Sequence, residues 1–159
     1  MEFDEVLRRR RMVRRFTDEP VSEADAERLV AAFLRAPSAG FTQGYHLLVL
    51  STPDERRRFW GTTAFEPPTE AHAEQARRLE QAPLLLVPLC SEAAYRERYE
   101  QPDKAWVDSE DLWSVPYWWI DAGFGALLLL LKAVDLGLGA LFMALTAREV
   151  PAFRGEFAV

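Results

Sequence analysis

Apolar positions recur with a helical period along the first half of the chain, interrupted by two continuous apolar runs. The helical stripes predict helices over residues 3–11, 53–60 and 69–81, and a further helix that follows the N-cap residue Ser22. That further helix must end by Ala36, because a proline at position 37 disfavours helical angles in the residue before it. The continuous runs over 45–51 and 83–89 predict buried strands.

The second half is dominated by a long apolar helix, predicted over residues 117–136 and closed by Gly137. Its apolar residues lie nearly all round, which predicts burial on most sides, either as a core spine or in an oligomer interface. A third strand is predicted over 139–145, and a helix over 146–153 that begins with the Thr146 and Glu149 capping pair. Residues 91–115 predict a helix over 92–99 and then a lid or a partner-contacting arm. No repeat or linker divides the chain, so we expect one domain over residues 1–159.

Composition excludes several classes of function. The 159 residues include one cysteine, Cys90, and two histidines that stand far apart, so neither a disulfide framework nor a metal centre is expected. The formal net charge of −6 disfavours nucleic acid as the main partner. The N-terminus lacks the apolar core of a signal peptide, and the most apolar run, 122–131, is too short to span a bilayer. We expect a soluble, cytoplasmic protein with no membrane partner.

An arginine run stands out against this acidic composition, because residues 8–15 hold six arginines in eight positions. So much like charge is tolerated where solvent or an anion offsets it. The guanidinium fork suits phosphate and planar carbonyl-bearing rings. The run therefore predicts an anion site, with a solvated helix face and a nucleic-acid arm as the alternatives. Acidic residues flank the run closely at positions 2, 4, 5, 18 and 19, and they disfavour the nucleic-acid arm.

Three segments stand in order along the chain: residues 10–21 read RRMVRRFTDEPV, residues 36–43 read APSAGFTQ, and residues 121–123 and 136–140 read DAG and LGLGA. Together they resemble the nitroreductase family, the flavin-dependent NAD(P)H oxidoreductases. Residues 10–21 resemble the family's opening RRS(V/I)RxFTDEPV. Residues 36–43 are similar to its APSAxNxQPW loop. Residues 121–123 and 136–140 look like the long central helix and the GLG turn behind it. The resemblance implies an α+β fold: an α/β/α sandwich with a mixed sheet, helices on both faces, a long central helix and an obligate dimer.

The resemblance also implies an FMN site at the dimer interface, with NADH or NADPH as hydride donor and a nitroaromatic or quinone as acceptor. Arg10 and Arg11 would hold the phosphate beside Met12, and Arg14 would lie near the pyrimidine carbonyls and favour the anionic reduced flavin. The other subunit would contribute the loop before the first strand, where the implied contacts are Pro37, Ser38, Ala39 and Phe41, with Gln43 fixing the loop. Leu138 and Gly139 would let the backbone pass close to the ring. The flavin would carry the chemistry, so no catalytic protein residue is expected.

The sequence departs from the family pattern at several points. Met12 replaces a serine and removes a hydroxyl donor near the phosphate, and Phe41 replaces an asparagine and removes an amide. Residues 43–45 read QGY in place of QPW. Val159 precedes the family's last strand, basic pair and partner-embracing arm, so we expect a C-terminally incomplete domain with weaker FMN binding. The alternative function is a non-catalytic dimeric or flavin-binding remnant of the family.

Two segments have purely structural alternatives. The loop over 37–43 also fits a plain helix-to-strand connection. The aromatic residues Trp113, Tyr117, Trp118 and Trp119 either roof a flavin pocket or pack in the core, and burial of aromatics on an apolar element favours the core.

Overall fold

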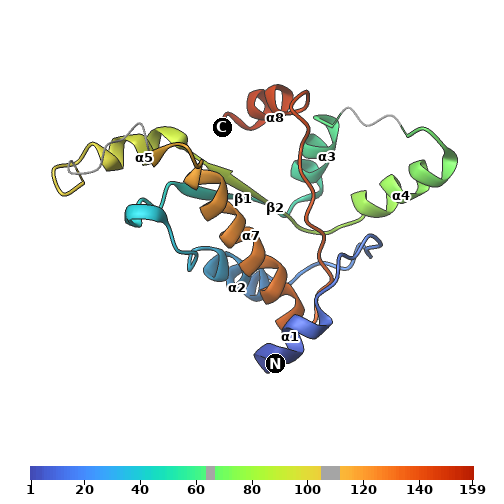
Figure 1. Cartoon of the computed structure of the whole chain (residues 1–159). Coiled ribbons are helices and arrows are strands. Elements are labelled where there is room, and N and C mark those ends of the chain that lie inside the picture. The colour runs from blue at the N-terminus through green and yellow to red at the C-terminus, as the bar shows by residue number, and fades with distance from the viewer. Residues whose placement is uncertain (64–66, 105–111) are drawn as a thin grey trace.

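A computed structural model describes residues 1–63, 67–104 and 112–159 (Figure 1). The elements in chain order are α1 (Phe3–Arg9), α2 (Glu23–Phe33), the 3-10 turn η1 (Ala39–Phe41), β1 (Tyr45–Leu50), α3 (Pro53–Gly61), α4 (Glu70–Glu80), β2 (Leu85–Cys90), α5 (Glu92–Tyr99), α7 (Tyr117–Asp135) and α8 (Val150–Phe157). The helices predicted over 3–11, 53–60, 69–81, 92–99 and 117–136 are confirmed to within about two residues at each end, and so are the first two strands.

Side-chain caps fix where the helices begin. At the start of α2, the Asp25 N–H donates to Ser22 Oγ at 3.1 Å. At the start of α3, the Glu55 N–H donates to Thr52 Oγ1 at 3.2 Å and the Thr52 N–H donates back to Glu55 Oε2 at 2.9 Å. The hydrogen bond from the Thr52 backbone holds the pKa of the Glu55 carboxyl below its usual range. Each cap satisfies a backbone donor that has no partner inside its helix.

The sheet lies between two layers of helices. Strands β1 and β2 pair antiparallel, from Tyr45 opposite Cys90 to Leu50 opposite Leu85, and their side chains alternate between the two faces. One face packs on α2 and α7 in a core of Leu29, Phe33, Ala36, Tyr45, Leu129 and Ala133. The other face packs on α3 and α8 around Leu50, Phe59 and Phe153. Helices therefore cover both faces, which confirms the α+β class and the α/β/α sandwich.

The sheet is smaller than the expected mixed sheet. Within the described residues it has two antiparallel strands, and the third strand predicted over 139–145 is wrong. That segment contributes an isolated parallel bridge between Met12 and Ala140, in which the Val13 N–H donates to the Ala140 carbonyl at 2.9 Å. A strand needs a partner along its length as well as suitable residues. Because Phe142 and Met143 find none in this part of the structure, they remain exposed.

The last helix is displaced along the chain from its predicted position. It begins at Val150 and runs to Phe157, whereas the prediction covers 146–153. The Thr146 N–H donates to the Glu149 carboxylate at 2.7 Å, so the predicted capping pair forms the turn that precedes the helix.

Helix α7 is buried on one side. Its buried residues recur at helical spacing and comprise Trp118, Asp121, Ala122, Gly125, Ala126, Leu129 and Ala133. The opposite side exposes Trp119, Ile120, Phe124 and Leu127. The prediction of burial on most sides is therefore wrong for a single chain. The whole helix, unlike the 122–131 run alone, is long and apolar enough to cross a membrane, but core helices pass the same test. Its packing on α2 and on both strands assigns α7 to the core.

Trp113 packs against α5 and α7. The rings of Trp113 and Tyr99 meet at 5.3 Å between centroids, and those of Trp113 and Trp118 at 5.7 Å. Trp118 is buried, as expected of a core aromatic, whereas Trp119 is exposed. The lid or arm predicted within 91–115 falls partly on residues 105–111, which lie outside the described residues.

Gly125 tests the contact between α2 and α7. A Cβ at this position would lie 2.5 Å from Phe33 Cε2, and the Phe33 ring is fully buried, so it has little room to move. Gly125→Ala should therefore lower the free energy of unfolding by about 1–3 kcal/mol, measured by chemical denaturation. Gly155→Ala in α8 is the control, because a Cβ there meets nothing within 4 Å. It should stabilise the protein by roughly 0.5–1 kcal/mol through helix propensity. Equal effects of the two substitutions would contradict the close contact.

Candidate functional site

A glycine turn closes the end of α7 and directs the chain that follows. Gly137 has a φ of 76°. Its N–H donates to the Val134 carbonyl at 3.0 Å, and the Leu138 N–H donates to the Ala133 carbonyl at 2.8 Å. These two bonds form a Schellman motif, in which the left-handed residue is normally glycine. Leu138 then packs against the core between α2 and α7.

The arginine run lies directly against this turn, through the bridge between Met12 and Ala140. A Cβ on Gly139 would lie 3.1 Å from both methyl groups of Val13, so the backbone comes close to the run at this point. The structure therefore brings Arg10, Arg11, Met12 and Arg14 together with Leu138 and Gly139, as the resemblance implies. Val13 gives Gly139 a structural reason to be small, and contact between this glycine and a cofactor stays a prediction.

The guanidinium groups of Arg10, Arg11 and Arg14 carry charge that the described residues do not balance. None of the three has a carboxylate partner or a side-chain hydrogen bond within 1–63, 67–104 and 112–159. In contrast, Arg9 pairs with Glu5 in α1. Arg10 is half-buried, and Arg11 and Arg14 are exposed. Neighbouring guanidinium groups without carboxylates favour binding of an anion such as phosphate.

The second predicted segment, Pro37–Gln43, forms a tight loop around η1. Gly40, Phe41 and Gln43 have φ of 61°, 54° and 52°. Such angles are costly for residues other than glycine, and they persist where surrounding contacts enforce them, often at functional sites. The Phe41 side chain is 76% exposed. These angles favour a role beyond a plain connection between helix and strand, and that role stays a prediction.

Hydrogen bonds inside the loop set its shape. The Gln43 N–H donates to Ser38 Oγ at 2.9 Å, and the Thr42 hydroxyl donates to the Ala39 carbonyl at 2.6 Å. Gln43 therefore fixes the loop through its backbone. In the described part of the chain its side-chain amide makes no hydrogen bond, which leaves that amide available to a ligand.

A buried carboxylate ties the loop to α7. Asp121 Oδ2 accepts hydrogen bonds from the Ala39 N–H at 2.8 Å and from the Tyr95 hydroxyl at 2.7 Å. Burial, and secondly the hydrogen bond to Asp121, raises the pKa of Tyr95, so the phenol stays protonated as a donor. From α5, Arg98 Nε donates to the Gly40 carbonyl at 3.1 Å. The sequence prediction omits Asp121, Tyr95 and Arg98. Asp121 could have been found from the sequence, because it is the one charged residue within the apolar run 117–131.

Within one chain, the two parts of the candidate site lie at opposite ends of α7 (Figure 1). The loop is tied to Asp121 near the start of the helix, and the arginine run meets the turn after its last residue, Asp135. A rise of 1.5 Å per residue puts Asp121 and Asp135, the last residue of α7, roughly 21 Å apart along the axis. One flavin cannot contact both parts in a single chain. The structure therefore does not bring Arg10, Arg11 and Arg14 together with Pro37–Gln43.

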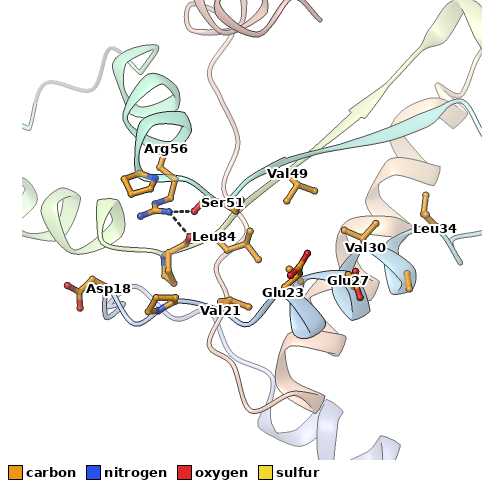
Figure 2. A pocket seen from close by; sticks show the side chains of 15 residues that line it. Asp18, Val21, Glu23, Glu27, Val30, Leu34, Val49, Ser51, Arg56 and Leu84 are labelled. Carbon is orange, nitrogen blue, oxygen red and sulfur yellow. Dashed lines mark hydrogen bonds between the residues drawn. The ribbon is translucent and has the colours of Figure 1, made fainter.

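A groove of about 800 Å³ lies elsewhere, between α2 with the segment before it and the end of β1 with α3 (Figure 2). Its lining combines apolar side chains with the carboxylates of Asp18, Glu23 and Glu27. Arg56 lies in its wall, and its Nη1 donates to the Ser51 carbonyl at 2.5 Å and to the Pro83 carbonyl at 2.8 Å. Carboxylates repel phosphate. Since none of the predicted site residues is among its described lining, this groove is not the candidate flavin site.

The family of the chain is decided by comparison with known proteins. Residues 7–158 match a family model described as the nitroreductase family. The chain belongs to the nitroreductase family. A comparison with curated protein sequences finds no match.

Solved structures of other nitroreductases share the fold. Nitroreductase CinD from Lactococcus lactis, in complex with nicotinic acid, is 20% identical with a TM-score of 0.76, over 99% of this chain and 81% of that one. A nitroreductase-like protein from Desulfovibrio desulfuricans, in complex with FMN, is 20% identical with a TM-score of 0.70, over 100% and 77%. A nitroreductase family protein from Clostridium difficile 630 is 20% identical with a TM-score of 0.72, over 100% and 76%. These likenesses confirm the nitroreductase fold. The roles of single residues must be argued from this chain.

The glycine turn after α7 can be tested by two substitutions at one position. Nothing lies within 4 Å of a Cβ at Gly137, so the cost of a side chain there comes from the φ of 76° alone. Gly137→Ala should lower the free energy of unfolding by about 1–2 kcal/mol. Gly137→Asn should cost less, because asparagine tolerates left-handed angles better. Chemical denaturation measures both values. An alanine variant as stable as the asparagine variant would contradict the proposed basis of the turn.

Proposed function

We propose that the chain is an FMN-dependent oxidoreductase of nitroreductase type that works as a homodimer. Its hydride donor would be NADH or NADPH, and its acceptor an electron-poor compound such as a nitroaromatic or a quinone. The observation that carries the proposal is a group of guanidiniums, Arg10, Arg11 and Arg14, that have no carboxylate partner among the described residues. They lie against the glycine turn after α7 in a member of this family. Bound FMN would supply the hydride transfer, and the protein would supply binding, orientation and electrostatics.

The residues present fit the chemistry of FMN. Arg10 and Arg11 are adjacent, without carboxylate partners among the described residues, and offer two donor forks to a phosphate. Arg14 offers a positive charge to the carbonyls of a pyrimidine ring, where charge favours the anionic reduced flavin. From the loop, two polar groups can serve the ring edge: the Ser38 hydroxyl, which accepts from the Gln43 N–H and can still donate, and the Gln43 side-chain amide. A structural neighbour was solved in complex with FMN, which supports FMN as the ligand class.

A second copy of the chain would complete the site. The exposed side of α7 presents Trp119, Ile120, Phe124 and Leu127, an apolar surface of the kind that marks protein interfaces. Two chains related by a twofold axis would pack these faces with the α7 helices antiparallel. The start of one α7, with its loop, would then lie beside the end of the other, with its arginines. This arrangement gives two equivalent sites, each built from the arginines of one subunit and the loop of its partner.

The first test distinguishes residues that bind the phosphate of FMN from residues that bind its ring. Purified protein should take up FMN and show its visible spectrum, and the Arg10→Gln, Arg11→Gln double variant should bind FMN at least about tenfold more weakly. Its affinity for riboflavin, which lacks the phosphate, should change little. Arg14→Gln should weaken binding of both flavins. Fluorescence titration measures all three.

Arg57→Gln is the matched control, because Arg57 is exposed and pairs with Asp54 on α3, away from the candidate site. It should leave the affinity for both flavins unchanged. A colourless protein that does not take up FMN would refute the proposed function. Equal losses for FMN and riboflavin in the double variant would refute the assignment of Arg10 and Arg11 to the phosphate.

The second candidate function is a non-catalytic, flavin-binding member of the family, favoured by the side chains at Met12 and Phe41. These two positions lack the hydroxyl and the amide that the family pattern provides. Steady oxidation of NADH or NADPH with a nitroaromatic or a quinone would exclude this candidate. FMN uptake without that oxidation would support it.

The dimer has its own test. Leu127→Glu should dissociate the protein, as measured by sedimentation, because it places a charge in the proposed apolar interface. Leu34→Glu, at the C-cap of α2, is the control: Leu34 is 55% exposed against 47% for Leu127, and it lines the groove away from the proposed interface. This control should keep the mass of the parent protein.

Mixed dimers test whether each site draws on both chains. We combine subunits that carry Arg10→Gln and Arg11→Gln with subunits that carry Ser38→Ala and Gln43→Ala. Each mixed dimer has one site in which both the arginines and the loop are intact. Up to half of the FMN sites should therefore regain the parent affinity. No recovery, in mixed dimers confirmed by mass, would refute a site shared between the two chains.

A further inference from the structure

We infer that Asp121, with Tyr95 and Arg98, forms a clamp that positions the loop Pro37–Gln43 for ligand binding. The clamp joins the loop to α7 and to α5. Its members act through the loop and are positioning residues for the site described above. The inference deepens the proposed function and rests on it for the identity of the ligand.

Hydrogen bonds within the loop determine its shape but not its place. The bonds from Gln43 to Ser38 and from Thr42 to Ala39 both begin and end inside the loop. They would survive a rigid movement of the whole loop. Placement therefore depends on contacts that leave the loop, and within the described residues the polar ones are the bonds to Asp121 and Arg98.

Asp121 joins the loop and α5 through one oxygen atom. Its side chain lies on the buried side of α7, and the residue is 3% exposed. Oδ2 accepts from the Ala39 N–H of the loop and from the Tyr95 hydroxyl of α5, and Tyr95 is fully buried. Hydrogen bonds to an ionised acceptor are stronger than those between neutral groups. The carboxylate thus holds Ala39, the residue next to Ser38, at a fixed point of α7.

Helix α5 holds the outer side of the loop. Arg98 donates from Nε to the Gly40 carbonyl, while its Nη1 and Nη2 donate to the two oxygens of Asp103 at 2.8 and 2.7 Å. Asp103 therefore fixes the plane of the guanidinium that holds Gly40. The ring of Tyr99 lies where a Cβ on Gly40 would be, 2.8 Å from Cε2. These contacts enclose the left-handed turn at Gly40 and Phe41.

The inference is tested with variants that remove one clamp contact at a time. Tyr95→Phe removes only the hydroxyl, and Asp121→Asn keeps a neutral carbonyl oxygen that can still accept. Asp121→Leu removes the acceptor at similar volume. We expect faster amide hydrogen exchange over residues 38–43 of the full chain without ligand in all three variants. The increase should be smaller for Asp121→Asn than for Asp121→Leu. Exchange over β1 should stay unchanged.

Flavin binding supplies the functional readout. Tyr95→Phe and Asp121→Leu should weaken binding of FMN and of riboflavin alike, by about tenfold, because the loop faces the ring and not the phosphate. Asp121→Asn should restore part of the loss caused by leucine. The Arg10→Gln, Arg11→Gln double variant differs, because it should weaken the binding of FMN and leave that of riboflavin almost unchanged.

Tyr45→Phe is the matched control. It also removes a buried phenol, whose hydroxyl donates to the Ala36 carbonyl at 2.6 Å, but this acceptor precedes the loop. It should lower the thermal midpoint much as Tyr95→Phe does, with no change in loop exchange or flavin affinity. Equal loop exchange in the two phenylalanine variants would overturn the clamp, and so would unchanged exchange over 38–43 in Asp121→Leu. If the parent protein binds no flavin, the proposed function fails, and the exchange measurement still decides the clamp.

Discussion

The packing of Phe33 against Gly125 is the contact on which the arrangement of the other elements depends. The Phe33 ring is fully buried and occupies the space that a side chain at position 125 would need. This close approach lays α2 directly on α7, and Tyr45 meets the same ring edge-on at 5.4 Å between centroids. Both helices are thereby fixed against one face of the sheet. Once α7 is fixed, its two ends become the points to which the loop and the arginine run are attached.

A rigid helix of 19 residues also keeps those two points apart. No rotation of side chains can bring a loop held at Asp121 to arginines held behind Gly137. The chain therefore has either two unrelated features or two halves of a site that another copy completes. The exposed face of α7 favours the second interpretation. Trp119, Phe124 and Leu127 form an apolar surface on the helix that separates the two halves. Antiparallel pairing of two α7 helices through this surface would place the loop of one chain beside the arginines of the other.

Features set by residues close in the chain can be predicted from the sequence, whereas features set by contacts between distant residues cannot. Ser22 and Pro37 act on neighbouring residues, so the bounds of helices and strands follow from local patterns. The strand predicted over 139–145 fails because pairing needs a distant partner, and the composition says nothing about whether one exists. In the candidate site, the motifs locate Arg10–Arg14 and Pro37–Gln43. They do not reveal the clamp, because Asp121 and Ala39 lie 82 residues apart in the chain. The sidedness of α7 is hidden for a related reason, since apolar residues on both faces cannot show which face this chain buries.

Backbone conformation explains why Arg10, Arg11 and Arg14 have no carboxylate partner in the part of the chain that the structure describes. The chain has 25 acidic and 19 basic residues, so carboxylates are not scarce. Most arginines on helices pair with an acid three or four positions away, as Arg57 does with Asp54 and Arg96 with Glu92. Residues 10–14 follow the end of α1, in a segment bridged to Ala140, where that spacing no longer brings side chains together. Their charge is thus held beside the turn by the backbone, which supports the proposal that an anion from outside binds there. Replacing the family's serine by Met12 removes one donor from this place, but it leaves intact the backbone bridge that positions the guanidinium groups.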